Sequence, residues 1–286
     1  MIIWRNGSFV EMEAARPGFD DRGFLLGDGV FETLLVQAKV PVFLDEHLAR
    51  LASAATAIGI SLPVDIDALT EICRAVAARL PDDAMRASMR ITLSRGAGPR
   101  GLLPPEDAAP QLYVAAAAAP QPPPKPVRLI MAQTRRNEGS LVSRLKTLSY
   151  LDSVLARMEA KAAGADEAIM LNNAGAVASA SAANVFVIAE GALFTPPIED
   201  GVLNGIVRQK ILDCAEGVGL SLQVSSIAPR QLQDGCVFLT NSLIGVQSAA
   251  ILDGRPLSDR PEVDRLRQAY SALIDEYIAA HVQGDA

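Results

Sequence analysis

The chain has 286 residues, half of them apolar and 21% charged, which is enough to build a large core and argues against disorder. Its net charge of −7 excludes a general nucleic-acid binder and a protein that holds anionic membranes through a basic face. Three widely spaced cysteines and two histidines argue against a disulfide framework or a structural zinc site. We therefore expect no metal. We also expect a cytoplasmic protein, because neither a signal-peptide core nor an apolar run of membrane-spanning length occurs.

The first part of the chain predicts mixed strands and helices. Turn residues between short apolar runs predict a hairpin, helical spacing of apolar residues predicts helices, and strict alternation predicts a half-buried strand. The expected elements are a hairpin turning at Asn6-Gly7, extended segments at 31–36 and 40–44, a helix from its N-cap Asp45 to Gly59, a helix at 66–80 and a strand over 89–93.

A proline-rich run, APQPPPKP at 119–126, interrupts the chain. Its prolines cannot continue a helix or a central strand, and they favour an extended connection. We place a linker at 120–126, between an N-terminal α+β domain of residues 1–119 and a C-terminal α+β domain of residues 127–286 that carries Lys146. The second domain is expected to contain a strand at 127–132, a helix at 148–163, strands at 166–172, 183–189 and 192–195, a helix at 204–217, a strand at 236–240 and a final amphipathic helix through Tyr277.

Lysine is rare, with five among the 26 basic residues. Lys146 differs from the others because it follows Leu145 and stands just before an apolar helix. Apolar surroundings favour a neutral amine, which is the form that attacks a carbonyl cofactor. A surface lysine whose stem packs on its leucine neighbours remains the alternative reading.

Two segments have the composition of phosphate-binding turns. GVLNGIVRQ (201–209) contains a glycine turn that opens a helix, where N–H groups and the helix dipole favour an anion. FLTNS (238–242) places polar residues directly after an apolar strand, and Arg50 shares a helix face with His47. Each segment also reads as an ordinary turn, helix start or surface arginine. Neither a P-loop nor a Rossmann glycine motif is present.

The order of these motifs resembles the class IV aminotransferase family of pyridoxal-phosphate enzymes, which includes branched-chain and D-amino-acid aminotransferases and aminodeoxychorismate lyases. The resemblance implies a two-lobed α+β fold of type IV, pyridoxal 5′-phosphate as cofactor and a homodimer. It runs through GDGVFET (27–33), EHLARL (46–51), SRGAGPRG (94–101), LKTLSYL (145–151), SAANVF (181–186) and GVLNGIVRQ.

The resemblance also implies roles for individual residues. Lys146 matches the lysine that bonds covalently to the cofactor and moves the substrate proton. The other implied cofactor contacts are Arg50, Tyr150, Ser179, Ile206, Val207, Thr240 and Asn241. Arg100, whose guanidinium suits a carboxylate, and Thr33 are candidate substrate contacts, and Arg22 and Glu32 are further pocket candidates.

Ser179 departs from the family pattern, which usually has a glutamate that keeps the cofactor's ring nitrogen protonated. A neutral serine cannot supply that charge, so the ring becomes a weaker electron sink. The favoured activity is transfer of an amino group from a small amino acid to a keto acid. An aminodeoxychorismate lyase that releases pyruvate and 4-aminobenzoate stands close beside it, and a catalytically weakened pyridoxal-phosphate binder is the alternative of another class.

Overall fold

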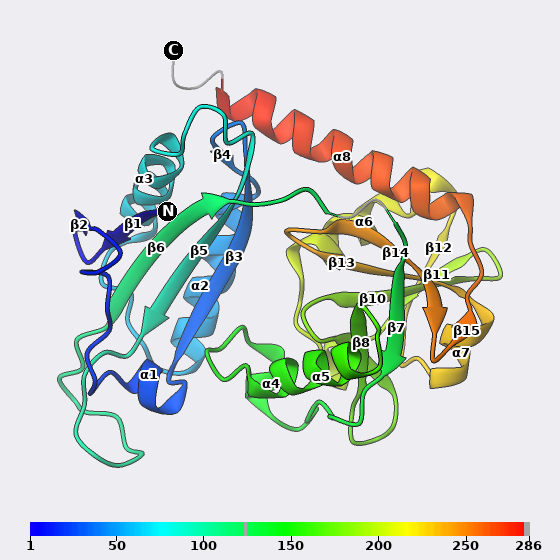
Figure 1. The fold of residues 1–286 in the computed structure, drawn as a ribbon, viewed down its shortest axis with the longest axis horizontal. Helices are drawn as coiled ribbons and strands as arrows, with labels where there is room; N and C mark the ends of the chain where they lie inside the picture. Colours follow the sequence, from blue (N-terminus) through cyan, green and yellow to red (C-terminus); the bar gives the residue numbers. More distant parts are fainter. Residues whose placement is uncertain (123–124, 283–286) are drawn as a thin grey trace. The chain divides into compact units, whose positions relative to one another are not determined.

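The computed structural model describes residues 1–122 and 125–282, whose contacts divide into two compact units (Figure 1). The first unit comprises Met1–Gln121, Leu145–Ser149 and Asp275–Ala286, and the second comprises Pro122–Arg144 and Tyr150–Ile274. Within the proposed linker at 120–126, Pro123 and Pro124 lie outside the described residues.

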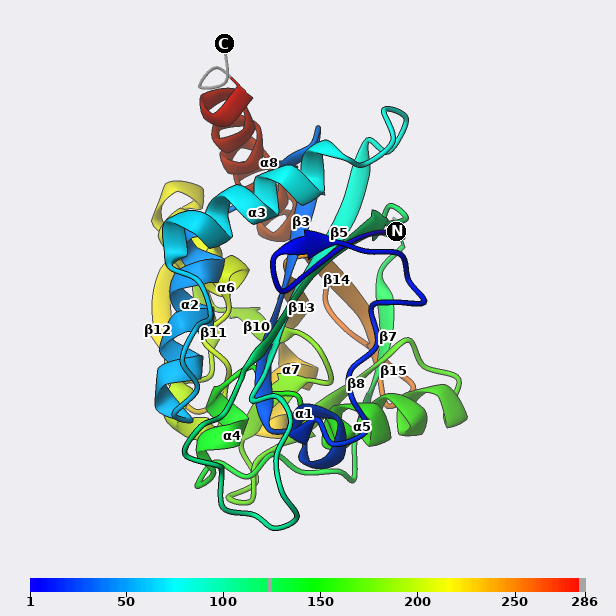
Figure 2. The same cartoon turned by 90° about the vertical axis from the view of Figure 1, so that its left-hand side faces the viewer.

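The first unit is built on a sheet whose neighbouring strands all run antiparallel within the described residues. Helices α2 and α3 pack on one face and bury alternate residues of the central strands (Figure 2). In sheet order the strands are β2 (Ser8–Phe9), β1 (Ile2–Arg5), β6 (Gln111–Ala118), β5 (Arg86–Ser94), β3 (Gly29–Gln37) and β4 (Val40–Pro41). The helices are α1 (Arg22–Leu26), α2 (Leu44–Ala57) and α3 (Ile66–Ala78), and α8 (Pro261–Val282) ends in this unit.

The predicted N-terminal hairpin is confirmed by β1 and β2. Its turn residues Asn6 and Gly7 have φ of 42° and 104°, in the left-handed region that asparagine and glycine tolerate. The predicted N-cap of the next helix is wrong. Phe43 occupies the cap position of α2 without a side-chain cap, and Asp45 lies in the first turn. A tertiary contact replaces the local cap, because the Leu44 N–H donates to the Tyr277 hydroxyl over 3.0 Å.

The segment Leu145–Ser149 groups with the first unit rather than with the C-terminal part of the chain, where the sequence placed Lys146. Thr147 forms an isolated antiparallel bridge with Val30 of β3, so these residues extend the first sheet. Leu145 packs against the core of this unit. The helix expected over 148–163 consequently begins only at Leu151, after the bridging residues.

The second unit contains a larger mixed sheet. Its inward residues form a continuous core that includes Ile169, Val185, Val237 and Leu239. In sheet order its strands are β12 (Ser221–Val224), β11 (Ala192–Thr195), β10 (Asn184–Ala189), β13 (Cys236–Asn241), β14 (Gly245–Leu252), β7 (Val127–Met131), β8 (Glu167–Leu171) and β9 (Val177–Ala180), with β15 (Arg255–Pro256) on β14. Its helices are α4 (Leu141–Arg144), α5 (Leu151–Ala162), η1 (Ile198–Asp200), α6 (Ile206–Cys214), η2 (Glu216–Val218), α7 (Pro229–Asp234) and the first part of α8.

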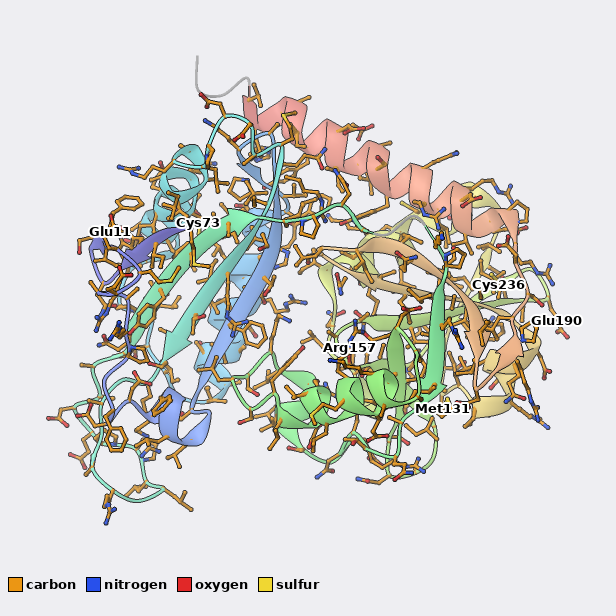
Figure 3. All side chains as sticks on the ribbon, viewed as in Figure 1. Glu11, Cys73, Met131, Arg157, Glu190 and Cys236 are labelled. Carbon is orange, nitrogen blue, oxygen red and sulfur yellow. The ribbon has the colours of Figure 1, made fainter. Side chains whose placement is uncertain are left out.

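Two of the three free cysteines are buried within these cores. Cys73 lies in α3 and Cys236 in β13 (Figure 3). Burial raises the pKa of the Cys73 thiol to about 12 and that of Cys236 to about 11. Neither thiol is therefore a reactive nucleophile near neutral pH. Among the described residues, no helix is both long and apolar enough to cross a bilayer.

Candidate active site

Lys146 is held at the edge of β3 by main-chain hydrogen bonds. The Phe31 N–H donates to the carbonyl of Lys146, and the Leu148 N–H donates to the carbonyl of Gly29, each over 2.9 Å. The Lys146 side chain lies over the Phe31 ring, with Nζ 4.4 Å from the ring centre. Backbone pairing and a cation–π contact thus fix the position of the amine.

Phe31 and Arg90 are residues of this site that the sequence did not single out. The guanidinium carbon of Arg90 lies 3.8 Å from the centre of the Phe31 ring. Thr33, a predicted substrate contact, is the partner of Arg90 in the β3–β5 register. The alternation of β5 carried the signal, because Met89 and Ile91 belong to the helix-side core and Arg90 must face the other way.

Glu32 lies on the helix side of β3 and is the centre of a buried polar cluster. Its carboxylate accepts hydrogen bonds from Nε and Nη2 of Arg50 over 2.7 and 2.8 Å. Nδ1 of His47 lies 2.8 Å from the second carboxylate oxygen, and both of these side chains are only 1% exposed. His47 and Arg50 reach one carboxylate because their spacing of three places them on the same face of α2.

The charges of this cluster follow from burial and pairing. Burial raises the pKa of Glu32, but hydrogen bonds from Arg50 and His47 outweigh it and lower that pKa to about 2. Burial lowers the pKa of His47 below its usual 6.5, and the hydrogen bond to the Glu32 carboxylate only partly offsets this. The charge of Lys146 contributes to the same lowering. At neutral pH the cluster is therefore an ionised Glu32 beside a neutral His47 and a charged Arg50.

In the second unit, Asn184 ties the beginning of α6 to β13. Its amide donates to the Leu203 carbonyl over 2.9 Å, and it is the register partner of Thr240. A Cβ on Gly205, the N-cap of α6, would come within 2.0 Å of the Asn184 amide oxygen, so only glycine fits there. No side chain caps this helix. The N–H groups of its first residues, Ile206 and Val207, therefore lie at a helix start that no side chain caps.

Two buried hydroxyls of the second unit have no hydrogen-bond partner among the described residues. They are Oγ of Ser179 in β9 and Oγ1 of Thr240 in β13, and these residues are 6% and 1% exposed. Buried hydroxyls are nearly always paired, because an unmade hydrogen bond there costs about 1–3 kcal/mol. Both hydroxyls are therefore exceptions among the buried polar groups of this unit.

Two other predicted contacts of the second unit are engaged differently. The side-chain oxygen of Asn241 accepts from the N–H groups of Leu243 and Ile244, and its amide donates to Ala182. Asn241 therefore shapes the turn after β13 with its side chain. Tyr150 stands at the N-cap position of α5, and its phenol acts electrostatically on Arg136.

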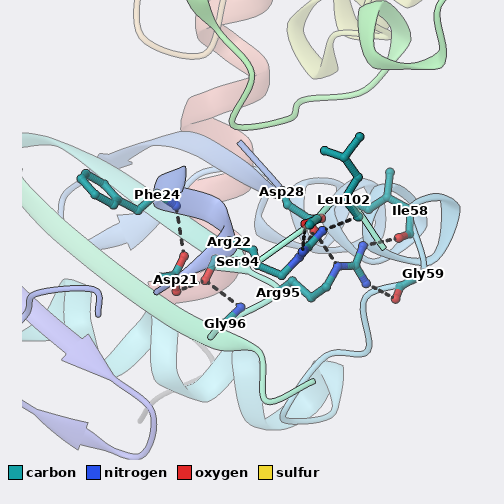
Figure 4. A network of polar contacts seen from close by, with 11 residues as sticks. Asp21, Arg22, Phe24, Asp28, Ile58, Gly59, Ser94, Arg95, Gly96 and Leu102 are labelled. Atoms are coloured by element: carbon teal, nitrogen blue, oxygen red, sulfur yellow. Dashed lines mark hydrogen bonds and ion pairs between the residues drawn. The ribbon is translucent and has the colours of Figure 1, made fainter. Parts of the chain in front are cut away.

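Arg100 and Arg22, both singled out from the sequence, have opposite surroundings. Arg100 is exposed on the loop after β5, and its side chain makes no hydrogen bond to another described residue. Arg22 is 3% exposed, and its donors bind Asp28, Gly101 and Leu102 (Figure 4). Each side-chain nitrogen of Arg22 is thus bonded within the protein.

Comparison with known proteins identifies the class. The chain matches the amino-transferase class IV model over residues 29–251, and it belongs to that family. It is 30% identical over 269 residues, 91% of each chain, to a Methanocaldococcus jannaschii protein described as a branched-chain-amino-acid aminotransferase. It is 28% identical over 260 residues, 90% of each chain, to the D-alanine aminotransferase of Bacillus licheniformis.

A solved structure from Legionella pneumophila, described as a 4-amino-4-deoxychorismate lyase, superposes with a TM-score of 0.84 at 31% identity. The match covers 90% of this chain and 95% of that one. The expected family and the mixed α/β fold of type IV are therefore confirmed, and the chain is an enzyme. These three similar proteins are described by three different activities.

Proposed function

We propose that this enzyme uses pyridoxal 5′-phosphate, with Lys146 as the residue that bonds to it. The unpartnered hydroxyls of Ser179 and Thr240 and the uncapped start of α6 support this assignment, since they fit a ligand with a phosphate and a ring nitrogen. In this proposal Arg50, Thr240 and the N–H groups of Ile206 and Val207 bind the phosphate. Tyr150 and the backbone at Asn241 complete the contacts, and Ser179 faces the ring nitrogen.

When bound, this cofactor supplies the electron sink that lets a substrate Cα lose its proton. Lys146 would accept that proton on its Nζ and deliver it to the cofactor. The contact with the Phe31 ring holds the amine in place for this transfer. Glu32 orients Arg50 toward the phosphate through two hydrogen bonds. Arg100 and Thr33 hold the substrate, with the Arg100 guanidinium on its carboxylate.

The function supported best is amino transfer from a small amino acid to a keto acid. The observation that carries it is Lys146, whose backbone is bonded to the edge of β3 and whose amine lies over the Phe31 ring, in a chain similar to two proteins described as aminotransferases. The test is to mix the cofactor-loaded enzyme with single D- and L-amino acids and measure keto acid released in one turnover. Release from a subset of donors is expected and names the substrate; release from none of them contradicts this function.

A second candidate, aminodeoxychorismate lyase activity, is favoured by Ser179. A hydroxyl supplies no negative charge to the ring nitrogen, and elimination with aromatisation of the product demands less of the electron sink than amino transfer does. Pyruvate and 4-aminobenzoate released from aminodeoxychorismate would support this candidate. In the same assays Ser179→Glu is expected to raise the ratio of amino transfer to elimination. The ratio should rise about tenfold for each 1.4 kcal/mol by which the new carboxylate stabilises the protonated ring nitrogen. An unchanged ratio would mean that Ser179 does not face the nitrogen.

We also propose that the enzyme is a homodimer that uses the exposed face of α5. Leu151, Val154, Leu155 and Met158 recur at helical spacing on α5 and are 42–68% exposed. A contiguous apolar stripe of this kind marks an interaction surface. Light scattering after size exclusion is expected to give a dimer for the wild type and a monomer for Leu155→Glu/Met158→Glu. Matched changes at two exposed residues, Arg74 of α3 and its C-cap residue Arg79, should leave the mass unchanged. A monomeric wild type would refute the dimer.

A further inference from the structure

The buried side chain of Arg22 is hydrogen-bonded to the backbone of the loop that follows β5. The residue is 3% exposed, and its side-chain nitrogens donate to three partners (Figure 4). Nη1 donates to the Gly101 carbonyl over 3.1 Å and Nη2 to the Leu102 carbonyl over 2.8 Å. Nε donates to Asp28 over 2.8 Å. These two carbonyls belong to the residues that directly follow Arg100, the proposed substrate contact.

Asp28 connects this arginine to a second one. Its Oδ2 also accepts from Nε of Arg95 over 2.8 Å, and Arg95 donates to the carbonyls of Ile58 and Gly59 over 2.7 Å each. Burial raises the pKa of Asp28, but the hydrogen bonds from Arg95 and Arg22 outweigh it, so the pKa is lowered and the carboxylate stays ionised. One carboxylate therefore fixes both guanidinium groups, and through Arg95 the pair is fastened to the turn after α2.

A glycine in the loop, Gly98, lets its backbone pack closely against the Arg22 side chain. A Cβ on Gly98 would come within 2.7 Å of the Arg22 Cδ, so glycine lets the backbone lie against the side chain. The last main-chain hydrogen bond before the tip runs from the Gly98 N–H to the Asp20 carbonyl. Among the described residues, the two bonds from Arg22 are the hydrogen bonds that hold 99–104. Leu102 and Leu103 are 82% and 85% exposed, so apolar packing of these two side chains does not substitute for the hydrogen bonds from Arg22.

We propose that Arg22 is a positioning residue that fixes the backbone beside Arg100, and that recognition of the substrate carboxylate by Arg100 depends on it. This inference rests on the assignment of Arg100 under the proposed function. A forked contact to a carboxylate requires that the guanidinium be held in place before binding, because ordering a mobile loop on binding weakens affinity. Arg22 contributes through the loop, since each of its three side-chain nitrogens already donates to a group of the protein.

The first test measures the loop directly with trypsin, which cleaves after an accessible arginine such as Arg100. In Arg22→Met the rate of cleavage at the Arg100–Gly101 bond should rise about tenfold or more, because the loop loses two hydrogen bonds. The rise should be smaller in Arg22→Lys, because lysine keeps a positive charge near Asp28. Cleavage at other sites, followed by mass spectrometry, should not accelerate. Arg86→Met is the matched control, because Arg86 also donates to a carbonyl, that of Pro120, outside this loop. An unchanged rate at Arg100 in both Arg22 variants overturns the proposal.

The second test separates positioning from general damage to the enzyme. With an active amino donor, Arg22→Lys should raise KM about tenfold and change kcat less than twofold, whereas simple destabilisation would lower the active fraction and kcat. In an Arg100→Ala background the same change should have no further effect on KM. Equal effects in both backgrounds overturn the proposal. If Arg100→Ala leaves KM unaltered, the substrate role of Arg100 fails and the dependence on Arg22 fails with it. If the wild type releases no keto acid, the proposed amino transfer is wrong. The same single and double variants of Arg22 and Arg100 are then compared by their Kd for 4-aminobenzoate, the product of the lyase reaction, in place of KM.

Discussion

Replacing Lys146 with alanine is expected to lower kcat by at least about 10³-fold and to abolish covalent attachment of the cofactor. The variant loses both the nucleophilic amine and the group that carries the Cα proton, and a general base alone contributes about 10²–10⁴-fold. Borohydride treatment followed by peptide mass analysis should locate the cofactor on the wild-type peptide that contains Lys146. The same peptide of Lys146→Ala should carry no added mass.

Lys161→Ala is the matched control, since Lys161 is an exposed lysine in α5, and this variant should retain wild-type turnover. The free energy of unfolding of Lys146→Ala shows whether a loss of activity comes from lost chemistry or from lost folding. The contact of Lys146 with the Phe31 ring is worth on the order of 0.5–2 kcal/mol, and its segment keeps the backbone bonds to β3 without the side chain. Cofactor still bound covalently at wild-type level in Lys146→Ala would remove this residue from the mechanism.

Replacing Glu32 with alanine is expected to cost about 3–5 kcal/mol of unfolding free energy, because it leaves Arg50 without its carboxylate in a largely buried position. Cofactor retention should fall as well, since Arg50 loses the two bonds that orient it. Urea unfolding and equilibrium dialysis measure the two effects. Glu71→Ala is the control, because the exposed Glu71–Arg74 pair of α3 is worth at most about 1 kcal/mol. Equal losses in the two variants would contradict the role of the buried cluster.

The same cluster predicts how stability depends on pH. The pKa of Glu32 is lowered from 4.5 to about 2 in the folded protein, so the unfolded chain binds more protons between these values. The pKa of His47 is also lowered from 6.5, which has the same sign. Stability should thus be fully present above 6.5, decline below it because of His47, and decline further from 4.5 toward about 2 because of Glu32. In Glu32→Gln the lower, Glu32-dependent part of the decline should disappear, and an unaltered curve would contradict the assignment.

Several features were predictable because their cause is local. The left-handed turn at Asn6-Gly7 needs residues that tolerate positive φ, and the sequence provides them. Gly205 before Ile206 marks a helix start that can receive an anion, and α6 begins there. Lys146 stood out by composition and by its apolar neighbours. The backbone dihedral, hydrogen-bonding and packing preferences of neighbouring residues are sufficient for predictions of this kind.

The remaining features depend on residues far apart in the chain. The run Gln111–Ala118 is rich in alanine, which by itself favours a helix, yet it becomes β6 because β1 and β5 supply partners on both edges. The first N–H of α2, that of Leu44, is satisfied by the hydroxyl of Tyr277, 233 residues further along the chain, and no neighbouring side chain caps the helix.

The sequence by itself determined the family, most strands and helices of each half, and the choice of Lys146 and two turns as candidates for the chemistry. Only the tertiary structure decided that Lys146 lies at the edge of β3, that Arg50 donates to Glu32, and that Arg22 donates to the carbonyls of Gly101 and Leu102. Each of these depends on which backbone or carboxylate groups are brought within hydrogen-bonding distance and removed from water. That outcome is set by strand pairing and burial across the whole unit, and no local sequence pattern records it.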